Sequence, residues 1–327
     1  MTSALQQVER ERIRGYVGWP RVVTPDLSYV RTSIVNVIFS GEEGAGDRNW
    51  VLIDAGMPGS AHSIAAAAAR RFGPGARPSA IILTHGHFDH VGALHALAEM
   101  WDAPIFAHDL EMPYLTGLSP YAPPDPTVGG GMMAAMSWIF PRGPSDFGGR
   151  IRRLPEDGSV PFMPGWRWIH TPGHTAGHVA LFRDSDATVI AGDAFITTKM
   201  ESALAVLEQR VEIHGPPSYF TPDWVAARRS VEDLARLEPN LAITGHGLPM
   251  EGRELKAGLH NLARDFDKVA VPHGGRYARH PAVADATGIV TVPPERGGVP
   301  PALIFGLGAG AALGLALGSL ARGRRRR

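Results

Sequence analysis

The stretch Thr84-His85-Gly86-His87-Phe88-Asp89-His90 places four side chains that can bind a metal within six consecutive residues. It follows the apolar run 80–83 and precedes an expected helix. Imidazole nitrogens and carboxylate oxygens are common ligands of zinc. A loop held at both ends by regular structure can direct such ligands toward one point. The stretch therefore predicts a metal site at the edge of a sheet.

Three more potential ligands share this placement. Each lies at the C-terminal end of a short apolar run and has a glycine beside it. They are His174 after residues 166–169, Asp193 after 188–191 and His246 after 241–244. A single histidine at a strand end is usually a surface residue. Four segments with the same placement instead predict one shared site.

Short apolar runs alternate with helical patterns along the chain. Residues 60–71 form an Ala-rich helical stretch that Gly73-Pro74 ends, and helices are also expected over 89–101, 221–237 and 251–269. Strands that alternate with helices in this way predict an α/β layered protein.

The composition excludes several classes of function. The chain has 327 residues with 32 basic and 32 acidic side chains, so its net charge indicates no nucleic-acid partner. It has no cysteine, so any metal must be held by His and carboxylates. The polar N-terminus lacks the apolar core of a signal peptide, and we expect a cytoplasmic protein.

The ligand segments resemble the motifs of a known family. His85-Gly86-His87-Phe88-Asp89-His90 is similar to the HxHxDH signature of the metallo-β-lactamase superfamily. His174, Asp193 and His246 match its later motifs in order, and Asp54 matches an early strand-end aspartate. The resemblance covers roughly residues 25–270 and implies an αββα sandwich with the site at one edge.

The resemblance also implies two divalent metal ions per chain. His85, His87 and His174 would hold one ion, Asp89, His90 and His246 the other, and Asp193 would bridge them. Two such ions lower the pKa of a bridging water, so that hydroxide forms near neutral pH. Asp89 is the candidate catalytic residue that orients the hydroxide or takes its proton. Zinc is the expected metal, and manganese and iron remain open.

Asp54 has two interpretations. In the first, its carboxylate accepts a hydrogen bond from a ligand histidine. In the second, it only forms a turn at the end of a strand.

The resemblance is closest to the glyoxalase II-like and lactonase branches. It implies hydrolysis of a small ester, thioester or lactone. The alternatives are a phosphodiesterase or nuclease of the same fold, and a non-catalytic metal-binding protein. The Pro- and Gly-rich segment 113–149 is expected to lie over the site. Its side chains either line a substrate pocket or pack in the core. The candidate substrate contacts are Met132, Met133, Met136, Trp138, Lys199 and Tyr219.

The predicted organisation has four parts. They are an N-terminal arm over 1–22, the hydrolase domain over 23–272, a linker over 273–301 and an apolar tail over 302–327 with a terminal Arg cluster. The tail holds twenty uncharged residues, 302–321, in which glycine recurs every four residues. This pattern favours membrane association. It leaves open whether the tail spans the bilayer, lies on it or is a flexible appendage.

Overall fold

A computed structural model describes residues 19–208 and 211–295. The arm up to residue 18, and the tail predicted over 302–327, lie outside the described residues. The described residues up to Pro294 belong to one compact unit. Within the described part of the chain, no helix has both the length and the hydropathy needed to cross a membrane.

The first sheet has seven strands in chain order. They are β1 (Arg21–Thr24), β2 (Leu27–Thr32), β3 (Val35–Ser40), β4 (Val51–Ile53), β5 (Ala80–Ile82), β6 (Ile105–Ala107) and β7 (Ile151–Arg153). Pairing is antiparallel from β1 to β4 and parallel from β4 to β7. Because the carboxyl ends of β4 and β5 meet at one edge, the segments that carry Asp54 and His85 leave the sheet side by side.

The second sheet has five strands in the order β12-β11-β10-β9-β8. They are β8 (Trp166–His170), β9 (Val179–Arg183), β10 (Thr188–Gly192), β11 (Leu241–Thr244) and β12 (Met250–Glu251). β10 and β11 are parallel neighbours, with Gly192 opposite Thr244. The segments that carry Asp193 and His246 therefore begin at adjacent positions of the sheet edge.

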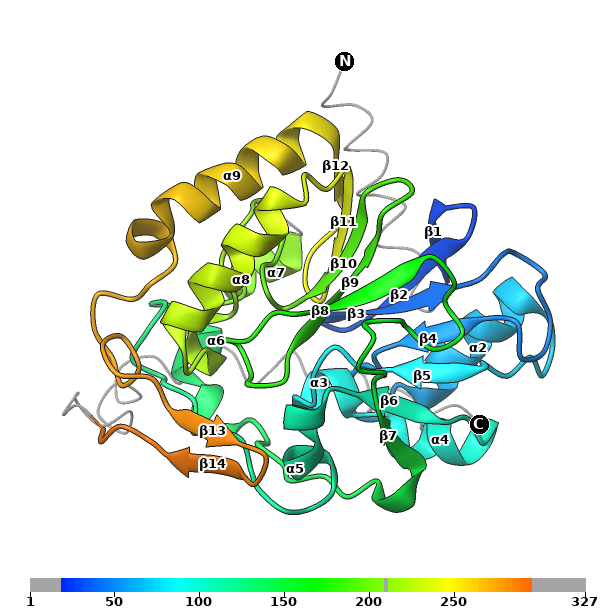
Figure 1. Cartoon of the computed structure of the whole chain (residues 1–327), viewed down its shortest axis with the longest axis horizontal. Coiled ribbons are helices and arrows are strands. Elements are labelled where there is room, and N and C mark those ends of the chain that lie inside the picture. The colour runs from blue at the N-terminus through cyan, green and yellow to red at the C-terminus, as the bar shows by residue number, and fades with distance from the viewer. Residues whose placement is uncertain (1–18, 209–210, 296–327) are drawn as a thin grey trace, which may run out of the picture. The chain divides into compact units, whose positions relative to one another are not determined.

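The two sheets lie face to face between helices (Figure 1). Helices α2 (Ala61–Phe72) and α4 (Leu94–Trp101) share a core with the first sheet, and α8 (Trp224–Arg236) and α9 (Gly252–Val269) share one with the second. A third core of buried side chains, among them Ile38, Ile53, Leu181 and Ile190, joins the inner faces of the sheets. The predicted αββα sandwich is confirmed.

The helix expected over 89–101 is two helices, α3 (Phe88–Val91) and α4, with Gly92 between them. Gly92 lies against the loop after β4, where its N–H donates to the carbonyl of Gly56 at 2.8 Å. A Cβ at residue 92 would lie 2.2 Å from the backbone nitrogen of Pro58. The helical stretch is therefore interrupted beside a contact that helical periodicity does not reveal.

Segment 113–149 is compact and contains little regular structure. Its short helices are α5 (Met112–Leu115), α6 (Met132–Ala135) and two 3-10 turns at Ser137–Ile139 and Gly148–Arg150. A small apolar cluster joins Val128, Ala134, Met133 and Phe140 to Phe220. Farther along, α7 (Ala203–Glu208) precedes α8.

Residues 273–294 are folded, contrary to the linker expected over 273–301. They include the antiparallel strands β13 (Val283–Asp285) and β14 (Gly288–Thr291). Tyr277 is buried, and Ile289 and Val292 pack against the core of the second sheet. Pro and Gly content suggested a linker, but these apolar side chains bind the segment to the hydrolase domain.

Candidate metal centre

The seven predicted ligands lie together at one edge of the sandwich, and all of them are buried. Three groups have ligand atoms within 4.8 Å of one another. The groups are His85 with His87 and His174, His85 with His90 and Asp193, and Asp89 with His90 and His246. The first and third groups are the two sets of ligands that the sequence analysis assigned to separate metals.

Asp193 lies between these two groups. Its Oδ2 is 3.5 Å from His174 Nε2 and 3.1 Å from His246 Nε2, and its Oδ1 is 3.6 Å from His90 Nε2. One carboxylate therefore faces imidazoles of both groups, which is the position required of a bridging ligand.

The buried polar atoms of the cluster test whether a metal fits. His85 Nε2, His90 Nε2 and Asp193 Oδ1 are buried and form no hydrogen bond. Buried polar atoms are normally paired, because leaving one unpaired costs about 1–3 kcal/mol. Neutral imidazole and carboxylate are the donors that divalent ions such as zinc accept. The residues present therefore fit a metal pair.

Neighbouring groups orient two of these imidazole rings and hold the backbone of a third residue. His90 donates from Nδ1 to Asp54 Oδ2 at 2.8 Å, which leaves Nε2 toward the centre. His246 donates from Nδ1 to the carbonyl of Ile34 at 2.8 Å. The backbone N–H of Asp193 donates to His178 Nε2 at 2.9 Å. Such partners fix the ring orientation and the tautomer of a ligand.

Asp54 itself is held by Thr84. Its Oδ1 accepts the backbone N–H of Thr84, and its Oδ2 accepts the Thr84 hydroxyl, both at 2.8 Å. The Asp54 side chain thus connects the loop after β4 to the start of the His85 loop and to His90. Of the two interpretations of Asp54, the geometry matches hydrogen bonding to a predicted ligand.

Burial and neighbouring charges divide the histidines into two electrostatic classes. Burial lowers the pKa of His85 and His174 well below the usual value and that of His87 to about 3, so these rings are neutral. Burial is the largest influence on His90 and His246 and opposes their charge, but the neighbouring carboxylates together outweigh it and raise the pKa of both rings. These carboxylates are Asp193, Asp54 and Asp89 for His90, and Asp193 and Asp89 for His246. Burial likewise disfavours the Asp193 carboxylate, yet His246 and His90 hold its pKa well below the usual value.

Gly245 permits the close approach of these groups. A Cβ at residue 245 would lie 2.1 Å from Asp193 Oδ1 and 2.8 Å from a carbon of the His90 ring. Any side chain there would displace two predicted ligands. The cluster leaves no room for a side chain at residue 245, which explains the glycine beside His246.

Glu111 and His178 are site residues that the sequence analysis missed. Glu111 is fully buried, and its carboxylate accepts from the N–H of Gly86 and of Gly177, both at 2.9 Å. It also accepts from the Thr175 hydroxyl at 2.6 Å and from the Tyr121 hydroxyl. Glu111 therefore joins the loop of His85 and His87 to the loop of His174. Glu111 lies shortly after the end of β6, as the predicted ligands lie after other strands. This position was the signal in the sequence that could have identified it.

Two cavities adjoin the cluster. The smaller is lined by Asp89, Asp193, His246, Tyr219 and Phe140, among others. The larger, about 270 Å³, lies on the side of His87 and His174. Both have His87, His174 and Phe220 in their walls. Of the predicted substrate contacts, Tyr219 lies at the site.

The other predicted substrate contacts are absent from the walls of both cavities. Met132, Trp138 and Lys199 are exposed. Met133 packs in the small apolar cluster with Phe220, and Met136 is partly buried. Segment 113–149 does border the cavities, but through Tyr114, Tyr121, Ala122, Pro123 and Phe140. Apolar composition alone did not show which of its side chains point inward.

The comparisons with known proteins agree with the fold and the cluster. The sequence model described as the metallo-β-lactamase superfamily matches residues 30–246. The chain is 50% identical over 221 residues to the probable metallo-hydrolase YflN of Bacillus subtilis (strain 168), covering 68% of this chain and 84% of that protein. It is 30% identical over 170 residues to the probable metallo-hydrolase YybB of the same organism, covering 52% and 64%.

A solved structure agrees in fold. A β-lactamase domain protein from Burkholderia ambifaria aligns with a TM-score of 0.56 at 18% identity, over 77% of this chain and 74% of that one. The sandwich and its buried His/Asp cluster define a metal-dependent hydrolase. The chain belongs to the metallo-β-lactamase superfamily.

Proposed function

We propose that this hydrolase holds two divalent metal ions and cleaves a small ester, thioester or lactone. The observation that carries the proposal is the carboxylate of Asp193, which lies between a three-histidine group and the group of Asp89, His90 and His246. The ligand atoms are all nitrogen or oxygen, which suits zinc, the metal we propose. When bound, two such ions would supply Lewis acidity to a substrate carbonyl and make a water nucleophilic near neutral pH.

The residues of the chain have separate roles in this reaction. In this proposal Asp89 orients the attacking water and accepts its proton. Its support is that Asp89 lines the smaller cavity, with Oδ2 3.5 Å from His246 Nε2. Tyr219 lines the same cavity, and burial followed by the nearby Asp89 charge raises its pKa. Its phenol therefore keeps its proton and can donate to a substrate oxygen. Phe140 and Phe220 line the same cavity and present apolar surface to it.

The surroundings favour a carbonyl substrate over a phosphodiester. Neither cavity has a lysine or arginine in its wall within the described residues. Phosphate recognition in proteins commonly relies on such cations. A neutral ester, thioester or lactone needs no cation beyond the proposed metals.

Metal content and turnover test the proposal together. Elemental analysis after mild reloading should give close to two equivalents per chain. A panel of thioesters, lactones and phosphodiesters should identify a carbonyl substrate. A value near zero metal in folded protein would contradict the proposed metal pair, and turnover of phosphodiesters alone would contradict the substrate class.

Asp193→Ala tests the bridging role. It should lower metal content and abolish turnover while circular dichroism still reports a folded protein. The matched control is Asp184→Ala, on the exposed turn between β9 and β10. It should retain metal and turnover. Unchanged turnover in Asp193→Ala would exclude the bridging role.

A further inference from the structure

We propose that the larger cavity binds the uncharged apolar acyl group of the substrate, and that residues 277–289 form its outer wall and select the acyl group. This inference rests on the proposed hydrolysis of an ester, thioester or lactone. It assigns a specificity role to a segment that lies beyond residues 30–246, the span matched by the superfamily model.

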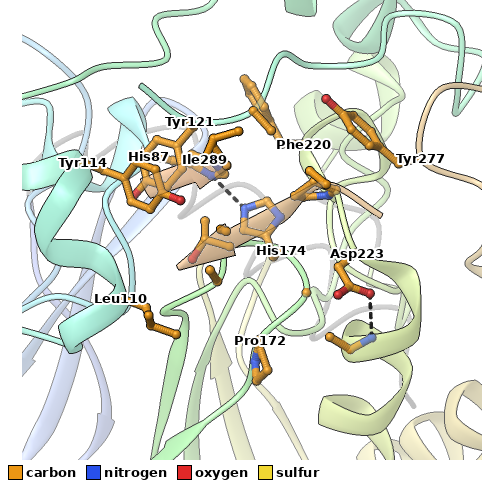
Figure 2. A pocket seen from close by; sticks show the side chains of 18 of the residues that line it. His87, Leu110, Tyr114, Tyr121, Pro172, His174, Phe220, Asp223, Tyr277 and Ile289 are labelled. Carbon is orange, nitrogen blue, oxygen red and sulfur yellow. Dashed lines mark hydrogen bonds between the residues drawn. The ribbon is translucent and has the colours of Figure 1, made fainter. Parts of the chain in front are cut away.

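The cavity adjoins the predicted ligands directly. His87 and His174 form its inner end, with His87 Nδ1 2.9 Å from His174 Nε2 (Figure 2). The Tyr121 ring packs against His87, with ring centroids 4.5 Å apart. Because both histidines and Phe220 also border the smaller cavity, a group held in the larger one can present its carbonyl to the cluster.

The chemistry of the wall selects an uncharged apolar occupant. Much of the surface comes from aliphatic and aromatic side chains such as Leu110, Pro172, Phe220 and Ile289. No lysine or arginine lines it within the described residues. The acidic side chain in the wall, Asp223, would repel an anion. A volume of about 270 Å³ is near the lower end of ligand pockets, roughly 300–1,000 Å³.

Three polar groups at the wall are already engaged with the protein. The Tyr277 hydroxyl donates to the carbonyl of Pro123 at 2.6 Å, and the Tyr121 hydroxyl donates to Glu111. Asp223 Oδ1 accepts the N–H of Ala226 at 2.9 Å as the cap of α8. A polar substrate would have to break these bonds, whereas an alkyl chain leaves them intact.

The outer wall is a built part of the domain. Ala282, Ala284 and Ile289 of the hairpin region face the cavity together with Tyr277. The N–H of Ala282 donates to the carbonyl of Pro222 at 3.0 Å, and the N–H of Ile289 donates to the Ser119 hydroxyl at 3.2 Å. The hairpin is thus attached both to the chain before α8 and to segment 113–149, which fixes its position beside the cavity.

Adjacent residues of β13 provide a test and its control. Ala284 lines the cavity, whereas its neighbour Val283 is 50% exposed and does not. Ala284→Phe should fill the cavity, and Val283→Phe adds the same ring on the outside. Metal-loaded protein would be assayed with thioesters of two to six acyl carbons. In the wild type, kcat/KM should rise roughly fourfold per methylene, the factor that corresponds to about 0.8 kcal/mol for burying one CH₂.

Ala284→Phe should remove most of this dependence on chain length, and Val283→Phe should keep it. Ile289→Ala enlarges the cavity and should move the preference to longer chains, which gives a second test if Ala284→Phe folds poorly. Equal chain-length dependence in Ala284→Phe and Val283→Phe, with both folded, would overturn the inference. So would a wild-type kcat/KM that does not change with chain length.

A binding measurement separates this inference from the proposed function. Calorimetry with 2-octanone, which cannot be hydrolysed, should show binding to the wild type and to Val283→Phe, and at least tenfold weaker binding to Ala284→Phe. If 2-octanone binds in this pattern but no ester, thioester or lactone is hydrolysed, the proposed function fails and the apolar site stands. If turnover occurs but 2-octanone binds all three proteins equally, the acyl site fails and the hydrolase stands.

Discussion

At the scale of single residues, the centre depends on side chains that hold the predicted ligands as well as on the ligands. Asp54 hydrogen-bonds to His90, and Glu111 accepts from both ligand loops. Neither residue needs to touch a substrate for its loss to disturb the site. Outer partners of this kind typically change metal affinity by about 10–100-fold when they are removed.

Asp54→Ala should weaken metal binding on the side of Asp89, His90 and His246, because His90 loses the acceptor that orients its ring. The expected loss is roughly 10–100-fold in affinity for one of the two proposed ions. Competition with a chromogenic chelator measures it. Asp47→Ala removes an exposed aspartate paired with Arg77 and serves as the control. Equal metal affinity in both variants would show that Asp54 has no orienting role.

Glu111→Ala should reduce both stability and metal content. It leaves the buried N–H of Gly177 and the Thr175 hydroxyl without their acceptor, at about 1–3 kcal/mol for each unpaired group, whereas the N–H of Gly86 keeps the Tyr121 hydroxyl as acceptor. Urea unfolding and elemental analysis measure the two effects. Glu99→Ala changes an exposed glutamate of α4 and should alter neither. A fully stable Glu111→Ala protein with wild-type metal content would refute the connecting role.

At the scale of elements, the segment between β6 and β7 combines an exposed outer surface with an inner aromatic layer. Phe140 stacks on Phe88 with ring centroids 5.4 Å apart and borders the smaller cavity. Trp138 lies two residues earlier and is 58% exposed. The position of each side chain relative to the cluster, and not its apolar character, determines whether it contacts a substrate.

Phe140→Ala should therefore raise KM by roughly tenfold, because burial of an aromatic side chain against substrate contributes about 1–2 kcal/mol. Metal content should stay at the wild-type value, since Phe140 is not among the predicted ligands. Steady-state kinetics with the best substrate of the panel measure the change. Trp138→Ala should leave KM within about twofold. A larger effect from Trp138→Ala would restore the expectation that Trp138 lines the pocket.

At the scale of the whole described domain, a charged contact links the two sheets beside their apolar core. Arg183 at the end of β9 donates to Asp26, which lies in the turn between β1 and β2. Burial opposes the charged form of Asp26, but its hydrogen bonds with Arg183 and Thr24 lower its pKa below the usual 3.8. A carboxylate with a depressed pKa stabilises the folded state above its unfolded pKa, and this contribution is lost as the pH falls.

Asp26→Asn should accordingly lower the free energy of unfolding by about 1 kcal/mol near pH 6. The difference from wild type should shrink as the pH falls below 4, because the wild-type carboxylate becomes protonated there. Urea unfolding at several pH values measures this difference, and protonation of the ligand histidines affects both proteins alike. Asp184→Asn, in an exposed pair with Arg167, should cost less. A difference independent of pH would contradict the electrostatic origin.

Local sequence was sufficient to predict an α/β layered protein and to select the side chains that form the buried His/Asp cluster, and the family resemblance added the αββα sandwich. His85, His87, Asp89 and His90 are close in the chain, so their shared role is visible without a structure. His174, Asp193 and His246 each follow an apolar run, and parallel strands bring such positions to a common edge. The alternation of strands and helices likewise predicted the layers, because each element's pattern is set by its own residues.

Only the tertiary structure decided the surroundings of that centre. Glu111 acts through Gly86 and Gly177, which are far from one another in the chain. The segment predicted to be a linker became a cavity wall because Tyr277 and Ile289 meet residues more than one hundred positions away, near Pro123 and Ser119. Local patterns record which face of an element is apolar but not which distant surface covers it. The predicted ligands could therefore be identified from the sequence, whereas the shape of the cavity depends on long-range packing that the sequence does not show.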